Sequence, residues 1–132
     1  MSEYAYEVAI DVRLRDVDFM GHVNNAIYAT YLEEAREAYF TDIVGQSLVE
    51  LDTVLASLEI EYETPIEAEQ TVTVGLGVTD LGDSSIPIEY EIRAGGTRAA
   101  TARSVQVFVD RETGRARSIP PELRTRLEAD SV

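Results

Sequence analysis

One segment of the chain, between Ala26 and about Phe40, has the residue spacing of a helix that is apolar around most of its circumference. Its apolar side chains recur at intervals of three and four residues: Tyr28, Leu32, Ala35 and Tyr39, widened by Ile27, Tyr31 and Ala38. Four charged residues fill the remaining arc: Glu33, Glu34, Arg36 and Glu37. A helix this apolar must be covered by the rest of the chain. We expect Asn24 or Asn25 to cap its start, and Gly45 to break it.

Five other segments alternate apolar and polar residues with the period of two that predicts half-buried strands. They are Glu3–Arg15, Val54–Glu63, Gln70–Thr79, Ile86–Arg93 and Arg98–Val109. The turns at 81–84 and 95–97 are so short that the strands they join must be antiparallel neighbours. Pro87 cannot donate to a strand ladder, so we expect it at a sheet edge or a β-bulge.

A turn at 110–114 and the pair Pro120-Pro121 lead into a short helix over Glu122–Ala129. The order of elements predicts an α+β fold, in which an antiparallel five-stranded sheet wraps around one long central helix. With 132 residues, the chain is expected to form a single domain over 1–132. Sheet edges and one flank of the helix stay uncovered, which favours self-association.

The charge balance is strongly acidic, because 25 Asp and Glu residues face 11 basic residues, all of them arginine. A net charge of −14 makes a small domain repel itself in dilute salt. At about 1 M salt the Debye length is roughly 3 Å, and most repulsion between exposed groups is screened. This composition predicts a halophilic protein of a salt-accumulating microbe. An acidic mesophilic protein from a GC-rich genome is the alternative interpretation.

Composition also excludes several classes of function. No basic stripe exists to bind nucleic acid, and no apolar run approaches the ~20 residues that span a bilayer. The chain has no cysteine, and His22 is its only histidine, so thiolate chemistry and a histidine-based metal site are excluded. We expect no metal and no cofactor, although a carboxylate-only metal site stays formally open. The expected location is cytoplasmic.

The segment Arg15–Asn25 places two carboxylates, a glycine and the only histidine directly before the long helix. A carboxylate held there can attack a carbonyl, or deprotonate a water beside it, while the helix end polarises the carbonyl oxygen. This arrangement favours acyl-transfer chemistry without a metal, a cysteine or a serine triad. The plain structural alternative is an aspartate that forms an Asx-turn in a loop.

These residues also carry a family resemblance. The pattern Arg-x-x-Asp-x-Asp-x-x-Gly-His-Val-Asn-Asn from Arg13 to Asn25, followed by the Tyr31-to-Arg36 stretch, resembles hot-dog-fold acyl-CoA thioesterases of the 4-hydroxybenzoyl-CoA thioesterase type. It is most similar to their long-chain acyl-CoA thioesterase subgroup. Weaker similarity continues through Ile60–Ile66, the turn at 82–85 and the strand ending at Asp110. The resemblance implies a homodimer or homotetramer with a continuous sheet and an active site at the subunit interface.

The resemblance also implies roles for individual residues. Asp18 is the catalytic carboxylate, either as nucleophile or as general base. His22 has three possible roles: it orients Asp18, contacts the acyl carbonyl, or packs and caps. A backbone N–H near Asn25 polarises the carbonyl. Gly21, Asn24 and Ser85 are candidate substrate-binding residues.

Further residues receive structural assignments. Asp16 is expected to order the loop through turn hydrogen bonds, Arg13 or Arg15. Glu33, Glu34 and Glu37 are expected to form a solvated or interfacial ion-pair face. Arg93, Arg98 and Arg103, at strand ends, are candidates to hold the negatively charged coenzyme A, and the sequence does not choose among them.

The leading hypothesis is hydrolysis of an acyl-CoA thioester to the free acid and CoA. An acyl-carrier-protein thioesterase with the same site is the second hypothesis. A non-catalytic acyl-CoA-binding hot-dog module is the third, and a pure scaffold has no need of a carboxylate at position 18.

Overall fold

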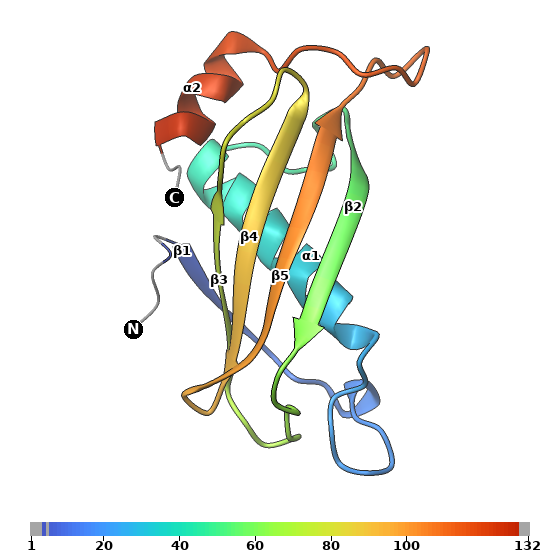
Figure 1. Cartoon of the computed structure of the whole chain (residues 1–132), viewed down its shortest axis with the longest axis vertical. Coiled ribbons are helices and arrows are strands. Elements are labelled where there is room, and N and C mark those ends of the chain that lie inside the picture. Colours follow the sequence, from blue (N-terminus) through green and yellow to red (C-terminus); the bar gives the residue numbers. More distant parts are fainter. Residues whose placement is uncertain (1–3, 5, 130–132) are drawn as a thin grey trace.

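The computed structural model describes residue 4 and residues 6–129. It contains five strands and two α-helices (Figure 1). The strands are β1 (Tyr6–Ile10), β2 (Thr53–Tyr62), β3 (Val72–Val78), β4 (Ser85–Ala94) and β5 (Thr97–Phe108). The helices are α1 (Ile27–Tyr39) and α2 (Pro121–Ala129). The predicted α+β class, with one long helix and five antiparallel strands, is confirmed.

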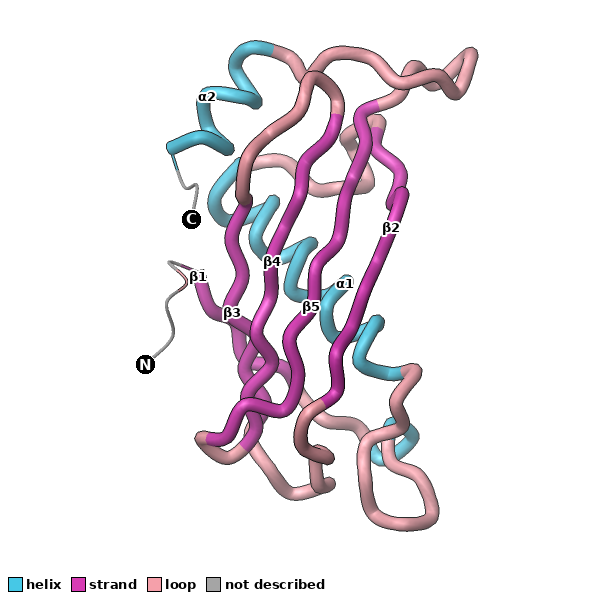
Figure 2. The backbone as a smooth tube through the Cα atoms, viewed as in Figure 1, coloured by secondary structure: helices cyan, strands magenta, loops and turns pink. Residues whose placement is uncertain are grey.

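All five strands form one antiparallel sheet in the order β1-β3-β4-β5-β2. Figure 2 shows α1 crossing one face of this sheet obliquely. Within the described residues, β1 pairs only with β3 and β2 pairs only with β5, so both are edge strands. β2 is ten residues long and carries a bulge between Leu55 and Ser57. A long strand edge without a partner is a surface on which another copy of the chain can pair.

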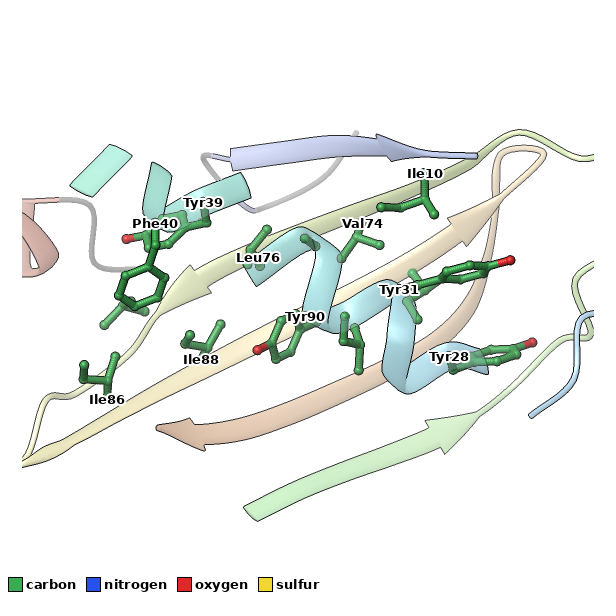
Figure 3. Close-up of a cluster of buried hydrophobic side chains, with 14 of the residues drawn as sticks. Ile10, Tyr28, Tyr31, Tyr39, Phe40, Val74, Leu76, Ile86, Ile88 and Tyr90 are labelled. Atoms are coloured by element: carbon green, nitrogen blue, oxygen red, sulfur yellow. The ribbon is translucent and has the colours of Figure 1, made fainter. Parts of the chain in front are cut away.

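The core lies between α1 and the sheet (Figure 3). Strands β3 and β4 direct alternate apolar side chains toward the helix, as their period of two requires. They are Val72, Val74, Leu76 and Val78 of β3, and Ile86, Ile88, Tyr90 and Ile92 of β4, all at most 1% exposed. The buried stripe of α1 faces them with Tyr28, Tyr31, Leu32, Ala35, Arg36 and Tyr39. The predicted apolar stripe is therefore confirmed, with the addition of one buried arginine.

The tight turn between β4 and β5 consists of Gly95 and Gly96, with φ angles of 57° and 84°. Two consecutive positive φ values are those of a type I′ hairpin, which joins twisted antiparallel strands and disfavours side chains larger than glycine or asparagine.

The prediction for Pro87 is wrong, because β4 is the central strand of the sheet. The Pro87 carbonyl accepts the N–H of Thr79, which is one residue beyond the end of β3. Pro87 therefore lies where the hydrogen-bond ladder between β3 and β4 ends, and its lack of an N–H interrupts no bond inside that ladder.

The ends of two predicted elements differ from the structure. The predicted strand over Glu3–Arg15 is only β1, because a 3-10 turn at Leu14–Asp16 follows and Leu14 is 92% exposed. The first residues of that prediction, 3 and 5, lie outside the described residues. The helical segment continues past α1 as one π-helical turn, Phe40–Val44, and ends at Gly45 with φ 87°, so the predicted break at Gly45 is confirmed.

Pro121 opens α2 as predicted, and α2 packs against the end of the π-helical turn. The guanidinium of Arg126 on α2 donates a hydrogen bond to the carbonyl of Val44 there. Within residues 4 and 6–129, no helix has the length and apolar content to cross a membrane.

Candidate active site

The motif before α1 folds into a compact loop over residues 16–24. Val17 and Val23 form an isolated antiparallel bridge across it. Inside that bridge the Asp18 N–H donates to the carbonyl of His22 at 2.8 Å, and the Gly21 N–H donates to the carbonyl of Asp18 at 3.0 Å. Gly21 has a φ of 84°, which only glycine adopts without strain. The loop therefore presents residue 18 from a hydrogen-bonded frame.

The carboxylate of Asp18 is held by two backbone groups of the same loop. Its Oδ1 accepts the N–H of Met20 at 2.9 Å and the N–H of His22 at 3.2 Å. Among the described residues, Oδ2 has no hydrogen-bond partner. One carboxylate oxygen is thus fixed by the loop, and the other is available to a substrate or a water.

Asp18 lies in a pocket of about 390 Å³ at the start of α1. The lining residues come from three parts of the chain: the loop, α1, and the end of β2 with the residues after it. They are Asp18, His22, Val23, Asn25, Tyr28, Tyr62, Glu63, Thr64 and Pro65. The structure therefore brings together Asp18, His22 and Asn25, the three residues predicted to be catalytic.

The backbone at the start of α1 has one N–H group that stays unpaired among the described residues. The N–H of Ala26 donates to the side chain of Asn24 at 2.9 Å, and the N–H of Ile27 donates to the Asn24 carbonyl at 2.9 Å. Among the described residues between 22 and 28, only Asn25 has an N–H without a hydrogen-bond partner. Asn25 also lines the pocket. A free N–H at a helix start is a hydrogen-bond donor for a developing oxyanion.

The prediction that Asn24 or Asn25 is the N-cap is wrong in its position. Ala26 directly precedes the helix and contributes no capping side chain. The Asn24 side chain performs the equivalent task two residues earlier, on the N–H of Ala26, because the chain already turns at residues 24–27.

Tyr62 connects β2 to the start of α1. Its hydroxyl donates a hydrogen bond of 2.8 Å to the carbonyl of Asn25, and its ring contacts the ring of Tyr28 edge-on at 4.9 Å. Tyr62 was not among the site residues predicted from the sequence. Its position in the Ile60–Ile66 stretch, which shares the family resemblance, was the available signal.

Asp16 is buried at 5% exposure and anchors the loop. Its Oδ2 accepts the N–H of Arg13 at 2.9 Å and the hydroxyl of Tyr31 at 2.8 Å, and its carbonyl accepts the N–H of Asn24. Burial, and then the hydrogen bond to Asp16, raise the pKa of Tyr31 well above its ordinary value. Asp16 therefore joins the loop to α1 through Tyr31, whose helical spacing had indicated only an apolar role.

Ser85 lies far from this pocket within one chain. It is the first residue of β4 and pairs with Val107 of β5. Val107 pairs in turn with Val54, near the start of β2. Tyr62 is at the other end of β2. With a rise of about 3.3 Å per residue, the two ends of this strand lie ~30 Å apart. The sheet in Figure 1 shows the start of β4 and the loop before α1 at opposite ends.

The three helix glutamates do not line the Asp18 pocket. Glu34 forms an ion pair with Arg13 at 3.8 Å. Glu37 accepts the hydroxyl of Ser47 at 2.6 Å and the N–H of Leu48 at 2.9 Å, and the Ser47 bond is the first cause of its lowered pKa. Glu33 is exposed. In the described part of the chain, no three His, Asp or Glu residues are grouped as metal ligands.

Comparison with known proteins identifies the family. The model of the thioesterase-like superfamily matches residues 12–127. A thioesterase from Thermus thermophilus, crystallised with coenzyme A and Zn, is 38% identical with a TM-score of 0.89, over 98% of this chain and 96% of that one. A predicted thioesterase from Bacillus stearothermophilus is 29% identical with a TM-score of 0.88, over 96% of each chain.

Among curated proteins, the uncharacterized protein YsmA of Bacillus subtilis (strain 168) is 27% identical over 117 residues, which are 87% of this chain and 80% of that protein. The sheet wrapped around one long helix matches the hot-dog thioesterases, as the sequence predicted. The matched region includes the loop, α1 and every strand after it, and the chain therefore belongs to the thioesterase-like superfamily.

Proposed function

We propose that the protein hydrolyses an acyl-CoA thioester to a free carboxylic acid and CoA. The observation that carries this proposal is one pocket containing both the Asp18 carboxylate, with a free Oδ2, and the unpartnered N–H of Asn25. An acyl carbonyl with its oxygen on that N–H has its carbon open to attack from the carboxylate side. Membership of the thioesterase-like superfamily and the CoA-bound relative support the same reaction.

Two routes use the same atoms. In the first, Asp18 Oδ2 attacks the thioester carbon, the C–S bond breaks, CoA leaves as the thiolate, and water then cleaves the mixed anhydride. In the second, Asp18 takes a proton from a water whose oxygen attacks the same carbon, and that proton passes to the departing thiolate. In both routes the N–H of Asn25 stabilises the negative charge on the carbonyl oxygen.

The other predicted residues take supporting roles in this proposal. His22 holds Oδ1 of Asp18 through its backbone N–H, and the residue lines the pocket. Gly21 gives the loop its turn through its positive φ, which a residue with a Cβ would adopt only with strain. Asn24 orders residues 24–27 so that the Asn25 N–H stays free.

We also propose that the functional unit is a homodimer, or a tetramer built from it, joined along β2. Antiparallel pairing of two β2 edges places the Thr53 end of one copy beside the Tyr62 end of the other. The Ser85 end of the sheet then meets the Asp18 pocket of the second copy, which is how Ser85 would contact the substrate. Exposed apolar side chains in and just before the motif loop, at Leu14, Phe19 and Met20, also favour a covered surface.

One panel tests the reaction. Acyl-CoA thioesters of different lengths, aromatic thioesters and acyl-carrier-protein thioesters are incubated with the protein while free thiol is measured. Release of thiol from CoA esters is expected. Release only from acyl-carrier-protein esters would select the second enzymatic hypothesis, and acyl-CoA binding without any release would select the non-catalytic module. Light scattering in high salt that finds a 14.6 kDa monomer would contradict the shared site.

A further inference from the structure

A second pocket, of about 570 Å³, lies between α1 and the edge strand β2. We refer to it as the α1–β2 groove. Leu48, Val49 and Leu55 give it an apolar wall, and its two most buried lining residues are polar: Arg36 of α1 and Gln106 of β5. These two side chains are 4% and 5% exposed. Two buried polar side chains in an open groove require an explanation.

Arg36 is the only buried basic residue of the described chain. Its Nη1 donates to the hydroxyl of Tyr90 at 3.0 Å, and that hydroxyl shares a 2.5 Å hydrogen bond with Ser104. Its Nε is buried without a hydrogen-bond partner. No carboxylate of the described residues lies within 4.0 Å of it. A buried guanidinium without a counter-charge is costly, and this chain has 25 carboxylates from which one could have been supplied.

The carboxylates nearest in sequence are engaged elsewhere. Glu37 accepts hydrogen bonds from Ser47 and Leu48, which hold the Leu48–Val49 wall against α1. Glu34 pairs with Arg13. Glu33 is exposed, and all three glutamates line the groove. None of these carboxylates forms an ion pair with Arg36 among the described residues, so its guanidinium is left to pair with an anion that enters the groove.

Gln106 supplies a second polar group in the same groove. Its Nε2 donates to the hydroxyl oxygen of Thr53 at 3.0 Å, and its Oε1 is buried without a partner. If the amide turns by half a rotation, Oε1 accepts the Thr53 hydroxyl and Nε2 takes the buried position that has no partner. Arg36 Nε–H and Gln106 Nε2–H are then two unpartnered donors on residues that line the groove.

We propose that the α1–β2 groove binds a carboxylate, and that this carboxylate is the distal end of the acyl group whose thioester lies at Asp18. This inference rests on the function proposed above and names its substrate class as mono-CoA thioesters of α,ω-dicarboxylic acids. Arg36 supplies the counter-charge and Gln106 the second hydrogen bond. The methylene groups of the chain contact Leu48, Val49 and Leu55.

The length of the substrate follows from the helix. Arg36 is eleven residues after Asn25, so ~16 Å of helix axis separates them at 1.5 Å per residue. An extended chain with C–C bonds of about 1.5 Å at about 111° advances ~1.25 Å per carbon, which gives ~13 carbons within one chain. In a dimer joined along β2, the groove of one copy lies nearer to Asp18 of the second copy than to its own Asp18. Shorter dicarboxylic acids then span the distance between the groove and the thioester site.

The test compares each dicarboxylic mono-CoA ester with the monocarboxylic acyl-CoA of the same length, from ~6 to ~14 carbons. For the best length, kcat/KM of the dicarboxylic ester is expected to be at least ~10-fold higher, since hydrogen bonds to charged groups are strong. In Arg36→Met this ratio should fall to about one. Replacing a buried charge by an apolar residue of similar volume is usually tolerated by the fold.

Gln106→Glu provides a second variant, because it places a carboxylate beside Arg36 permanently. It should abolish the preference for the dicarboxylic ester through repulsion. Arg115→Met, in the exposed turn after β5, removes the same charge from the surface and should leave the ratio unchanged. Free dicarboxylic acid of the best length should raise the melting temperature of the wild type and not of Arg36→Met.

These measurements distinguish a failure of the groove proposal from a failure of the proposed reaction. If thioesters are hydrolysed without any preference for a distal carboxylate, the groove proposal is overturned and the reaction stands. If no thioester is hydrolysed but free dicarboxylic acid still stabilises the protein in an Arg36-dependent way, the groove stands and the reaction falls. If Arg36→Met dissociates the oligomer and leaves the ratio unchanged, a carboxylate of a second copy is the counter-charge, which also overturns the proposal.

Discussion

The hydroxyl of Tyr62 donates a 2.8 Å hydrogen bond to the carbonyl of Asn25, so the last residue of the edge strand holds the peptide that precedes α1. This bond joins two segments 37 residues apart. It aligns the residue whose N–H is free in the Asp18 pocket. The geometry of the pocket therefore depends on the sheet edge as well as on the motif loop.

Removing the Tyr62 hydroxyl tests this dependence. Tyr62→Phe keeps the ring contact with Tyr28 and loses only the bond to Asn25. A neutral hydrogen bond contributes about 1 kcal/mol, so kcat is expected to fall ~5-fold with little change in KM. Tyr6→Phe is the matched control, because it removes a 2.7 Å hydroxyl bond to Asp42 outside the pocket. Equal losses in both variants would show that Tyr62 acts only through general stability.

Substitution of the two aspartates of the motif is expected to affect different properties of the protein. Asp18→Asn keeps the size of the side chain and removes its charge, so turnover should fall at least ~100-fold while folding and oligomerisation persist. Asp16→Asn should affect stability more than turnover, because Asp16 joins the loop to Tyr31. Thiol-release kinetics and thermal melting of both variants measure this. Equal and mild effects would mean that the catalytic carboxylate is elsewhere, and Glu34 would be tested next.

Glu37 is expected to contribute to acid sensitivity. Its hydrogen bonds, first to Ser47, lower its pKa in the folded state. A carboxyl whose folded pKa is lowered stabilises the protein above its unfolded pKa, near 4.3, and this contribution is lost as the pH falls through the folded value. Glu37→Gln should therefore lower the melting temperature at pH 7 and converge with the wild type once the pH lies below the folded pKa of Glu37. Parallel curves over this range would contradict the assignment.

The acidic composition predicts a steep response to salt. Repulsion among the 25 carboxylates is screened at molar salt, so melting temperature and activity should fall as salt is diluted. Screening also lets an anionic CoA ester approach an anionic protein. A melting temperature that stays constant from about 0.1 to 3 M salt would favour the acidic mesophilic alternative.

Much of this architecture follows from local sequence patterns. The helical spacing of Tyr28, Leu32 and Tyr39 predicted the buried face of α1, and the alternation after Asp52 predicted four strands with their short turns. The motif from Asp16 to Asn25 indicated where a carboxylate and a helix start would meet. These features are local, because they depend on periodicity, turn residues and neighbours in the chain.

Tertiary structure decided what depends on segments distant in sequence. The sheet order placed β4, with Pro87, in the centre, and it placed Tyr62 on Asn25 and Ser85 at the opposite end. Tyr31 became the partner of Asp16 only when the loop folded onto α1. Arg36 counted as part of a polar arc by spacing, yet the sheet buries it against Tyr90. Burial and pairing across the sheet are set by packing, which no local window of sequence contains.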